Sequence, residues 1–352
     1  MNHKKEKSSG TGFGPSKKAG LIFLFGAGLM VLCLWSLAQG MYQMSVGDVA
    51  GVLRARLFLF GGVVAPARLF DTIVWGIRVP RVMLAVATGV ALATSGAVFQ
   101  GCFRNPLVEP YILGVSSGAA CGAALGIIFP GFLLSVQVLA FAGGAMAVLW
   151  AYSIARVRGE TPVVTLVLAG IIVGSVFSAF LGILKYMAHD AALREIVFWL
   201  MGGFYYACWK DVLVVYPVVG AGFIIVWALG WKLNVLTMGD DQARSLGLDP
   251  EKYKLVFMGL ATLMTAVSVS SVGVIPWVGL MLPHAARMII GPDNRFVIIL
   301  SGVLGALYMV ACDTLARTLT QTEIPVGIIT SLLGAPYLFC LLRSKGKTAF
   351  SG

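Results

Sequence analysis

The sequence predicts an all-α integral membrane protein whose helices cross the bilayer many times. Of its 352 residues, 59% are hydrophobic and only 12% are charged, and the mean hydropathy is +0.90. A soluble domain carries about 25% charged residues, so this chain has too few charges to cover a surface exposed to water. Apolar runs long enough to cross the hydrocarbon core follow one another along most of the chain. Because unpaired backbone groups are costly in lipid, these runs are expected to be helices.

In chain order, a polar basic tail comes first, and ten spans follow it. Residues 1–20 have the composition of a disordered tail. Ten spans are expected within residues 21–343: 21–39, 82–103, 110–129, 132–155, 162–184, 212–231, 255–272, 274–290, 296–312 and 324–342. Two long apolar stretches are divided by breakers, one at Pro130-Gly131 and the other at Gly273 and Pro276. Residues 344–352 form a second tail.

The distribution of basic residues predicts the orientation of the spans. Most of the 26 Lys and Arg residues fall in the segments that share a side with the N-terminus. Cytoplasmic segments of membrane proteins are enriched in these residues, so both termini are expected in the cytoplasm. This bias also accounts for the net charge of +11, and nucleic-acid binding is not expected.

Two kinds of local pattern stand out between and within the spans. Residues 45–58 have an apolar stripe at helical spacing, and Ser45 or Asp48 could cap a helix there. Small residues recur every four positions in two spans and predict ridges for close helix packing. The ridge in the third span consists of Gly114, Gly118, Gly122 and Gly126. Lining of a transport pathway is the alternative role of these glycines.

The carboxylates are almost all outside the spans. Only Asp313 falls within one, near its outer end, and Arg317 four residues later is placed to pair with it on a helix. A functional role for Asp313 is the alternative, since intramembrane charge is often functional. Carriers driven by ion gradients usually place ionisable ligands near the middle of the membrane. Energy for transport is therefore expected from a partner, such as an ATPase.

The chain shows no motif for catalysis or metal binding. Its three histidines do not cluster with Cys or Asp, and its six cysteines are far apart. The segment Gly346-Lys347-Thr348 resembles the end of a phosphate-binding loop, but residue 341 is Leu341 where that loop requires glycine. We therefore expect neither a catalytic residue nor a cofactor on this chain.

Two polar segments on the inner side have features of functional elements. Residues 237–254 form the longest inner loop, in which Asp240 and Asp241 suit a helix start and Gly247 suits a helix end. A short helix there could dock a soluble partner, and a solvated connector is the alternative. The segment 104–110 pairs two prolines with charged residues between two apolar helices, which is typical of a stiff turn at a place where a gate could be.

An ordered series of motifs carries a family resemblance. The motifs are Arg78-Val79-Pro80-Arg81, Ser95 to Gly101, Asn105-Pro106-Leu107 with Glu109-Pro110, Leu113 to Gly118, Trp199 to Phe204, Ala243 to Gly247, Gly279 to His284, Glu323 to Gly327 and Leu333 to Pro336. Over residues 70–343 the chain resembles the FecCD-type permeases of bacterial ABC importers for iron–siderophore complexes, haem and cobalamin.

The resemblance implies a fold, an activity and partners. The fold would be the ten-span type II ABC importer bundle, working as a homodimer or a heterodimer with a close paralogue. The fifth and tenth spans would line a pathway at the dimer interface. Two cytoplasmic ATPase subunits would hold the ATP and Mg, and a periplasmic or lipid-anchored binding protein would deliver the cargo. The location implied is the bacterial inner membrane.

The resemblance also implies roles for individual residues. Three arginines would face outward and dock the binding protein: Arg78, Arg81 and Arg317. The cytoplasmic gate would comprise Asn105, Leu107, Thr161, Val163 and Val164. The coupling helix for the ATPase, about residues 237–248, would use Gly239, Asp240, Asp241, Ala243, Arg244, Leu246 and Gly247. The interval from Arg317 to Glu323 is one residue shorter than usual in the family, and Arg317 departs from the family pattern in this respect.

The sequence thus predicts a non-enzymatic permease for ATP-driven uptake of an iron chelate, haem or a corrinoid. Related permeases also handle molybdate-type oxyanions. An ion-driven secondary carrier is the alternative class, and an intramembrane enzyme is a third.

Overall fold

The computed structural model describes residues 13–345, apart from 41, 43, 58–67, 132–133 and 157–159. The described residues form helices joined by short connections, and they include no strand. The elements are α1 (Pro15–Ala38), α2 (Val46–Leu57), α3 (Arg68–Asp71), a π-helical turn η1 (Thr72–Arg78), α4 (Val79–Phe103), a 3₁₀ turn η2 (Pro110–Leu113), α5 (Val115–Ile128), α6 (Val136–Ala155), α7 (Val163–Met187), α8 (Asp190–Met201), α9 (Trp209–Ala228), α10 (Gly230–Thr237), α11 (Asp240–Ser245), α12 (Pro250–Val272), α13 (Val278–Ile290), α14 (Asn294–Ala316) and α15 (Val326–Lys345).

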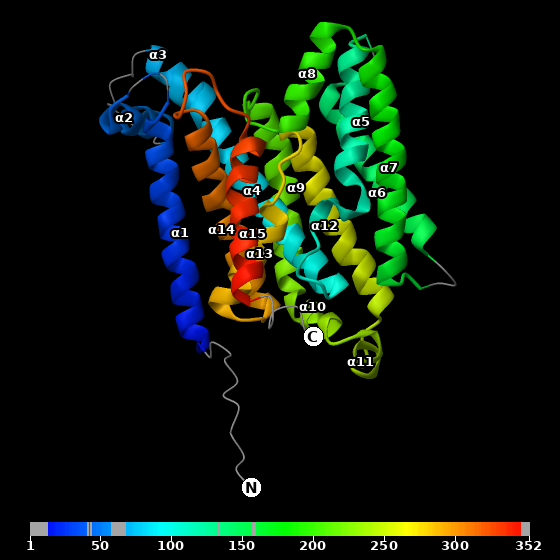
Figure 1. Cartoon of the computed structure of the whole chain (residues 1–352). Helices are drawn as coiled ribbons and strands as arrows, with labels where there is room; N and C mark the ends of the chain where they lie inside the picture. Colours follow the sequence, from blue (N-terminus) through cyan, green and yellow to red (C-terminus); the bar gives the residue numbers. More distant parts are fainter. Residues whose placement is uncertain are drawn as a thin grey trace.

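Most of the long helices stand side by side as a bundle (Figure 1). Helix α4 is the central one and packs against α14, α12, α13 and α9. Helices α5, α6 and α7 form a group at one flank, and α1 covers α14 at the other flank. The first turn of α1 and the last turn of α15 lie at the same end of the bundle as α11, which we call the inner end. Helices α2 and α3 lie at the opposite, outer end.

Each predicted span overlaps an apolar helix. Seven helices of the described chain are long and apolar enough to cross a membrane unaided. Three shorter apolar helices, Val115–Ile128, Val278–Ile290 and Val326–Cys340, coincide with the third, eighth and tenth predicted spans. The all-α membrane fold is therefore confirmed. The count of ten crossings and the cytoplasmic position of the termini stay predictions.

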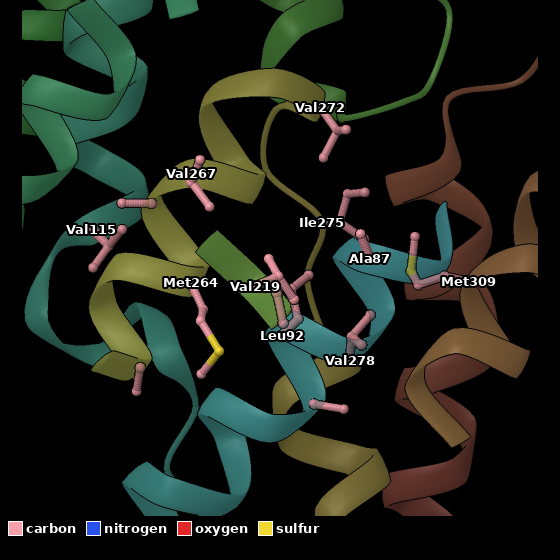
Figure 2. Close-up of a cluster of buried hydrophobic side chains, with 14 of the residues drawn as sticks. Ala87, Leu92, Val115, Val219, Met264, Val267, Val272, Ile275, Val278 and Met309 are labelled. Carbon is pink, nitrogen blue, oxygen red and sulfur yellow. The ribbon is translucent and has the colours of Figure 1, made fainter. Parts of the chain in front are cut away.

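The core lies where α4 meets α9, α12, α13 and α14. Figure 2 shows Leu92 of α4 beside Val219 of α9, with Met264 of α12 and Val278 of α13 close by. These side chains are buried, and α4 is buried along most of its length. Apolar side chains gain no hydrophobic energy by leaving lipid for protein, so close packing must hold this core together.

Three glycines of the predicted ridge, Gly118, Gly122 and Gly126, pack α5 against α6, whereas Gly114 precedes α5 and faces α7. A Cβ atom added at Gly118 would lie 2.3 Å from the carbonyl oxygen of Gly143, and one at Gly122 would lie 2.0 Å from that of Leu139. Only glycine permits the backbones to approach so closely. At Gly114 the backbone has φ of +82°, which also favours glycine. The packing role of the ridge is thus supported by the structure.

The predicted cap of α2 is present, and an aspartate caps α12. At the start of α2, the Asp48 N–H donates to Ser45 Oγ at 3.1 Å, and the Ser45 N–H donates to Asp48 Oδ2 at 3.0 Å. Helix α12 begins at Pro250, and Asp249 caps it by accepting from the backbone of Glu251 at 3.1 Å. The reciprocal bonds satisfy backbone donors that a helix start leaves unpaired.

A break divides α12 from α13 inside the bundle, at the predicted breakers. Helix α12 ends before Gly273, whose φ is +76°, residues 273–276 have no regular secondary structure, and Trp277 has a left-handed backbone with φ of +76°. The Tyr111 hydroxyl donates to the carbonyl of Ile275 at 2.9 Å and lies 3.3 Å from its N–H. Irregular backbone inside a membrane protein needs such internal partners.

The terminal segments differ from the predicted boundaries. Helix α1 begins at Pro15, so the end of the predicted tail 1–20 is helical, because Pro15 suits a first helical turn and apolar residues follow it. Residues 1–12 lie outside the described residues. Helix α15 continues to Lys345, and residues 346–352 of the C-terminal tail also lie outside the described part.

Candidate functional site

A short helix, α11, projects from the inner end of the bundle (Figure 1). A glycine lies beside each end of this helix: Gly239 has φ of +123° and Gly247 has φ of +77°. These left-handed positions let the chain turn sharply before and after the helix. The predicted helix within 237–248 is therefore present, as Asp240–Ser245.

Asp240, the first residue of α11, lies between two cations from other elements. Its Oδ2 atom is 2.6 Å from the Nζ atom of Lys254 on α12, and its Oδ1 atom is 3.7 Å from the guanidinium of Arg104. Arg104 has a left-handed backbone, with φ of 52°, and ends α4. The start of α11 is thus bound to both α4 and α12.

Glu251 extends this polar cluster to the start of α7. Its Oε1 atom is 3.3 Å from Lys254 Nζ, and its Oε2 atom accepts from the N–H of Thr161 at 3.0 Å and from the Thr161 hydroxyl. Thr161 is buried and directly precedes Pro162, the N-cap of α7. Next to it, Glu160 pairs with Arg244 of α11 at 2.8 Å and raises the pKa of that guanidinium.

The structure brings the two predicted gate segments to the inner end, one on each side of this cluster. In the first segment, Asn105 Oδ1 accepts from the N–H of Leu107 at 2.9 Å and stiffens the turn after α4. In the second, Val163 begins α7 and is half-buried. Leu107 and Val164 are exposed. Their role as a gate stays a prediction.

The predicted coupling residues divide into a buried and an exposed set. Ala243 packs inward, while Asp241, Arg244 and Gly247 are exposed. Leu246, which directly follows α11, leaves 62% of its surface exposed, and Met238, just before the helix, leaves 61% exposed. These two exposed apolar side chains beside its ends make α11 a candidate docking surface.

The three arginines predicted to face outward are instead buried at the outer end of the bundle. The exposed fractions of Arg78, Arg81 and Arg317 are 5%, 6% and 5%. Arg81 pairs with Asp313 at 2.9 Å and with Glu323 at 2.8 Å. The Nε atom of Arg317 lies 3.3 Å from Asp313, so the predicted pair on α14 is present.

The other contacts of these arginines tie α1 to the bundle. Arg78 donates to the carbonyl of Leu37 at 2.7 Å, and Arg317 donates to that of Ser36 at 2.6 Å. Both carbonyls belong to the last turn of α1, where a helix leaves acceptors unpaired. The guanidinium groups turn inward because these acceptors and Asp313 are inside. The predicted outward orientation of the three arginines is therefore wrong, and their docking of a binding protein stays a prediction.

Helices α7 and α15, the fifth and tenth predicted spans, have uncovered apolar surfaces. On α7 the exposed residues include Leu168, Ile172 and Ile183, and on α15 they include Leu332 and Phe339. Elsewhere, no group of three His, Cys, Asp or Glu residues within the described chain could hold a metal ion.

Sequence reasoning missed Lys254, which it treated as one basic residue of an inner loop. A signal was present, because Asp249-Pro250 marks the start of α12. Lys254 then shares a helix face with Phe257, Met258 and Ala261, all of which are buried. A lysine on such a face must find an anionic partner.

Comparison with known proteins identifies the family. The model of the FecCD transport family matches residues 28–344. The chain belongs to the FecCD transport family. A FecCD relative, the cobalamin import system permease BtuC of Halobacterium salinarum, is 43% identical over 276 residues, which are 78% of this chain and 74% of that protein.

Two further proteins are similar to this chain. A probable iron chelatin transport permease of Helicobacter pylori is 38% identical over 78% of this chain and 83% of its own. The solved structure of an inward-facing metal-chelate type ABC transporter superposes with a TM-score of 0.82 at 31% identity, covering 93% of this chain and 99% of the other. This chain therefore has the fold of an ABC transporter permease.

Proposed function

We propose that this chain is the permease subunit of an ATP-driven importer that carries a metal chelate across the plasma membrane into the cytoplasm. The cargo would be an iron–siderophore complex, haem or a cobalamin-type corrinoid. Membership of the FecCD family and the names of two relatives, which specify cobalamin and iron chelatin, support this class of cargo. The family resemblance implies that the cargo would pass between two copies of the chain, beside α7 and α15, whose exposed apolar faces leave room for a second copy.

The observation that best supports ATP-driven work is the position of α11. This helix projects from the inner end with an exposed leucine, and its ion pairs reach the segments on either side of the predicted gate. A soluble ATPase that docks on α11 could therefore act on the gate from outside the membrane. ATP and Mg would belong to that ATPase, and a binding protein would supply cargo at the outer end.

The proposal is tested by assembly with the cognate ATPase. We expect Leu246→Asp to reduce the ATPase that co-purifies with the permease by at least about tenfold, because a charge replaces the exposed apolar anchor of α11. Leu319→Asp is the matched control, since Leu319 is 59% exposed against 62% for Leu246 but lies at the outer end. Equal ATPase recovery with both variants would contradict docking on α11.

A further inference from the structure

Lys254 is a buried cation that the proposed pathway and docking surface do not use. Only 2% of its surface is exposed, although it lies in the second turn of α12 at the inner end of the bundle. Lysine is almost never buried to this extent without ionic partners. Here the partners are Asp240 of α11 at 2.6 Å and Glu251 of α12 at 3.3 Å.

Each carboxylate also contacts one of the two predicted gate segments. Asp240 is the first residue of α11 and also faces Arg104, which directly precedes the gate residue Asn105. Glu251 holds the backbone and hydroxyl of Thr161, two residues before α7 begins. The order of contacts is therefore Arg104, Asp240, Lys254, Glu251 and Thr161, which we call the inner relay.

The inner relay connects α11 to the start of α7 through α12. A displacement of α11 must either move Lys254 with Asp240 or separate Asp240 from a buried ammonium group. Separation is costly, because it leaves a charge with 2% exposure without its nearest partner. Arg244 and Glu160 form a second connection, but both side chains are exposed, so water and salt weaken their attraction.

We propose that Lys254 is a positioning residue that transmits movement of α11 to both gate segments. This inference rests on the proposed function, and it assigns the transmission to the ion pairs of a buried cation and not to the exposed pair of Arg244 and Glu160. To transmit the movement, the side chain at position 254 must be long and cationic, because it contacts one carboxylate on α11 and another on α12. An uncharged side chain of similar length would fill the space without binding either carboxylate.

The test measures cargo imported per ATP hydrolysed by the complete importer in proteoliposomes. We expect Lys254→Met to lower this ratio at least about tenfold relative to the wild type, because hydrolysis no longer moves the gate. Lys254→Arg should recover most of the ratio, since a guanidinium also pairs with carboxylates. Lys252→Met is the matched control, because Lys252 is exposed on the same helical turn and its loss should leave the ratio unchanged.

A second variant covers the case in which Lys254→Met does not fold. Thr161→Val has the same shape but removes the hydroxyl that bonds to Glu251, and it leaves no buried charge unpaired. We expect the ratio to fall about fivefold with an unchanged melting temperature, which a merely structural role would not produce.

The outcomes separate the two proposals. If the wild type imports cargo with ATP but Thr161→Val and every folded Lys254 variant keep the wild-type ratio, the inner relay is wrong and the proposed function stands. If the wild type shows no import with ATP, the proposed function fails, and the inner relay fails with it.

Discussion

Arg81 is the residue around which the outer end of the bundle is organised. It contacts Asp313 at 2.9 Å and Glu323 at 2.8 Å, from α14 and from the segment that precedes α15. Asp313 is 1% exposed and also faces Arg317. Two cations and two carboxylates therefore share one poorly solvated site, and each charge depends on the others.

We expect Arg81→Ala to lower the free energy of unfolding by about 3–5 kcal/mol, because it leaves a buried carboxylate short of its cation. Thermal unfolding in detergent measures the change. Arg54→Ala is the control, since Arg54 is an exposed arginine of α2 at the same end. A role in docking alone predicts the reverse pattern, with normal unfolding of Arg81→Ala and weaker affinity for the binding protein.

The sequence could predict only the local part of this charge cluster. Asp313 and Arg317 are four residues apart on one helix, so their pairing follows from helical spacing. Arg81 and Asp313 are 232 residues apart, and no periodicity joins them. Lys254 is a mixed case, because its pair with Glu251 follows from helical spacing, whereas its partner Asp240 belongs to a different helix.

At the scale of elements, the contact of α5 with α6 depends on backbones that nearly touch. The carbonyl oxygen of Gly143 occupies the place where a side chain at Gly118 would begin, 2.3 Å from that Cβ position. Such contacts let van der Waals packing hold two helices that gain nothing from the hydrophobic effect in lipid.

We expect Gly118→Ala to lower the free energy of unfolding by about 1–3 kcal/mol, because the methyl group must push the two backbones apart. Chemical unfolding in mixed micelles measures the loss. Gly220→Ala on α9 is the control, since the structure describes no atom within 4 Å of the added Cβ. Equal stability of the two variants would contradict close packing at Gly118.

Helix boundaries were predictable where caps and breakers mark them, as at Ser45, Pro250 and Gly273. The break between α9 and α10 was not predictable from the sequence. A single span was expected over 212–231, but α9 ends at Ala228 and α10 begins at Gly230. Gly230 packs against the backbone of Arg295, with 3.3 Å from its Cβ position to Arg295 Cα, and this contact with α14 has no signature within the span itself.

At the scale of the whole molecule, the chain has a packed core and exposed apolar surfaces around it. Its core surrounds α4, whereas α7 and α15 have uncovered apolar faces, and α11 projects from the inner end. Composition alone predicted the membrane fold. The partners, the pathway and the source of energy are not encoded in any single helix, because they depend on surfaces that other chains would cover.

The most direct test is cargo uptake into sealed proteoliposomes that contain this permease with its cognate ATPase and binding protein. The account predicts accumulation of the metal chelate when ATP is available to the ATPase, and none when a proton or sodium gradient is imposed without ATP. Accumulation driven by an ion gradient through the permease alone, with no ATPase present, would contradict it.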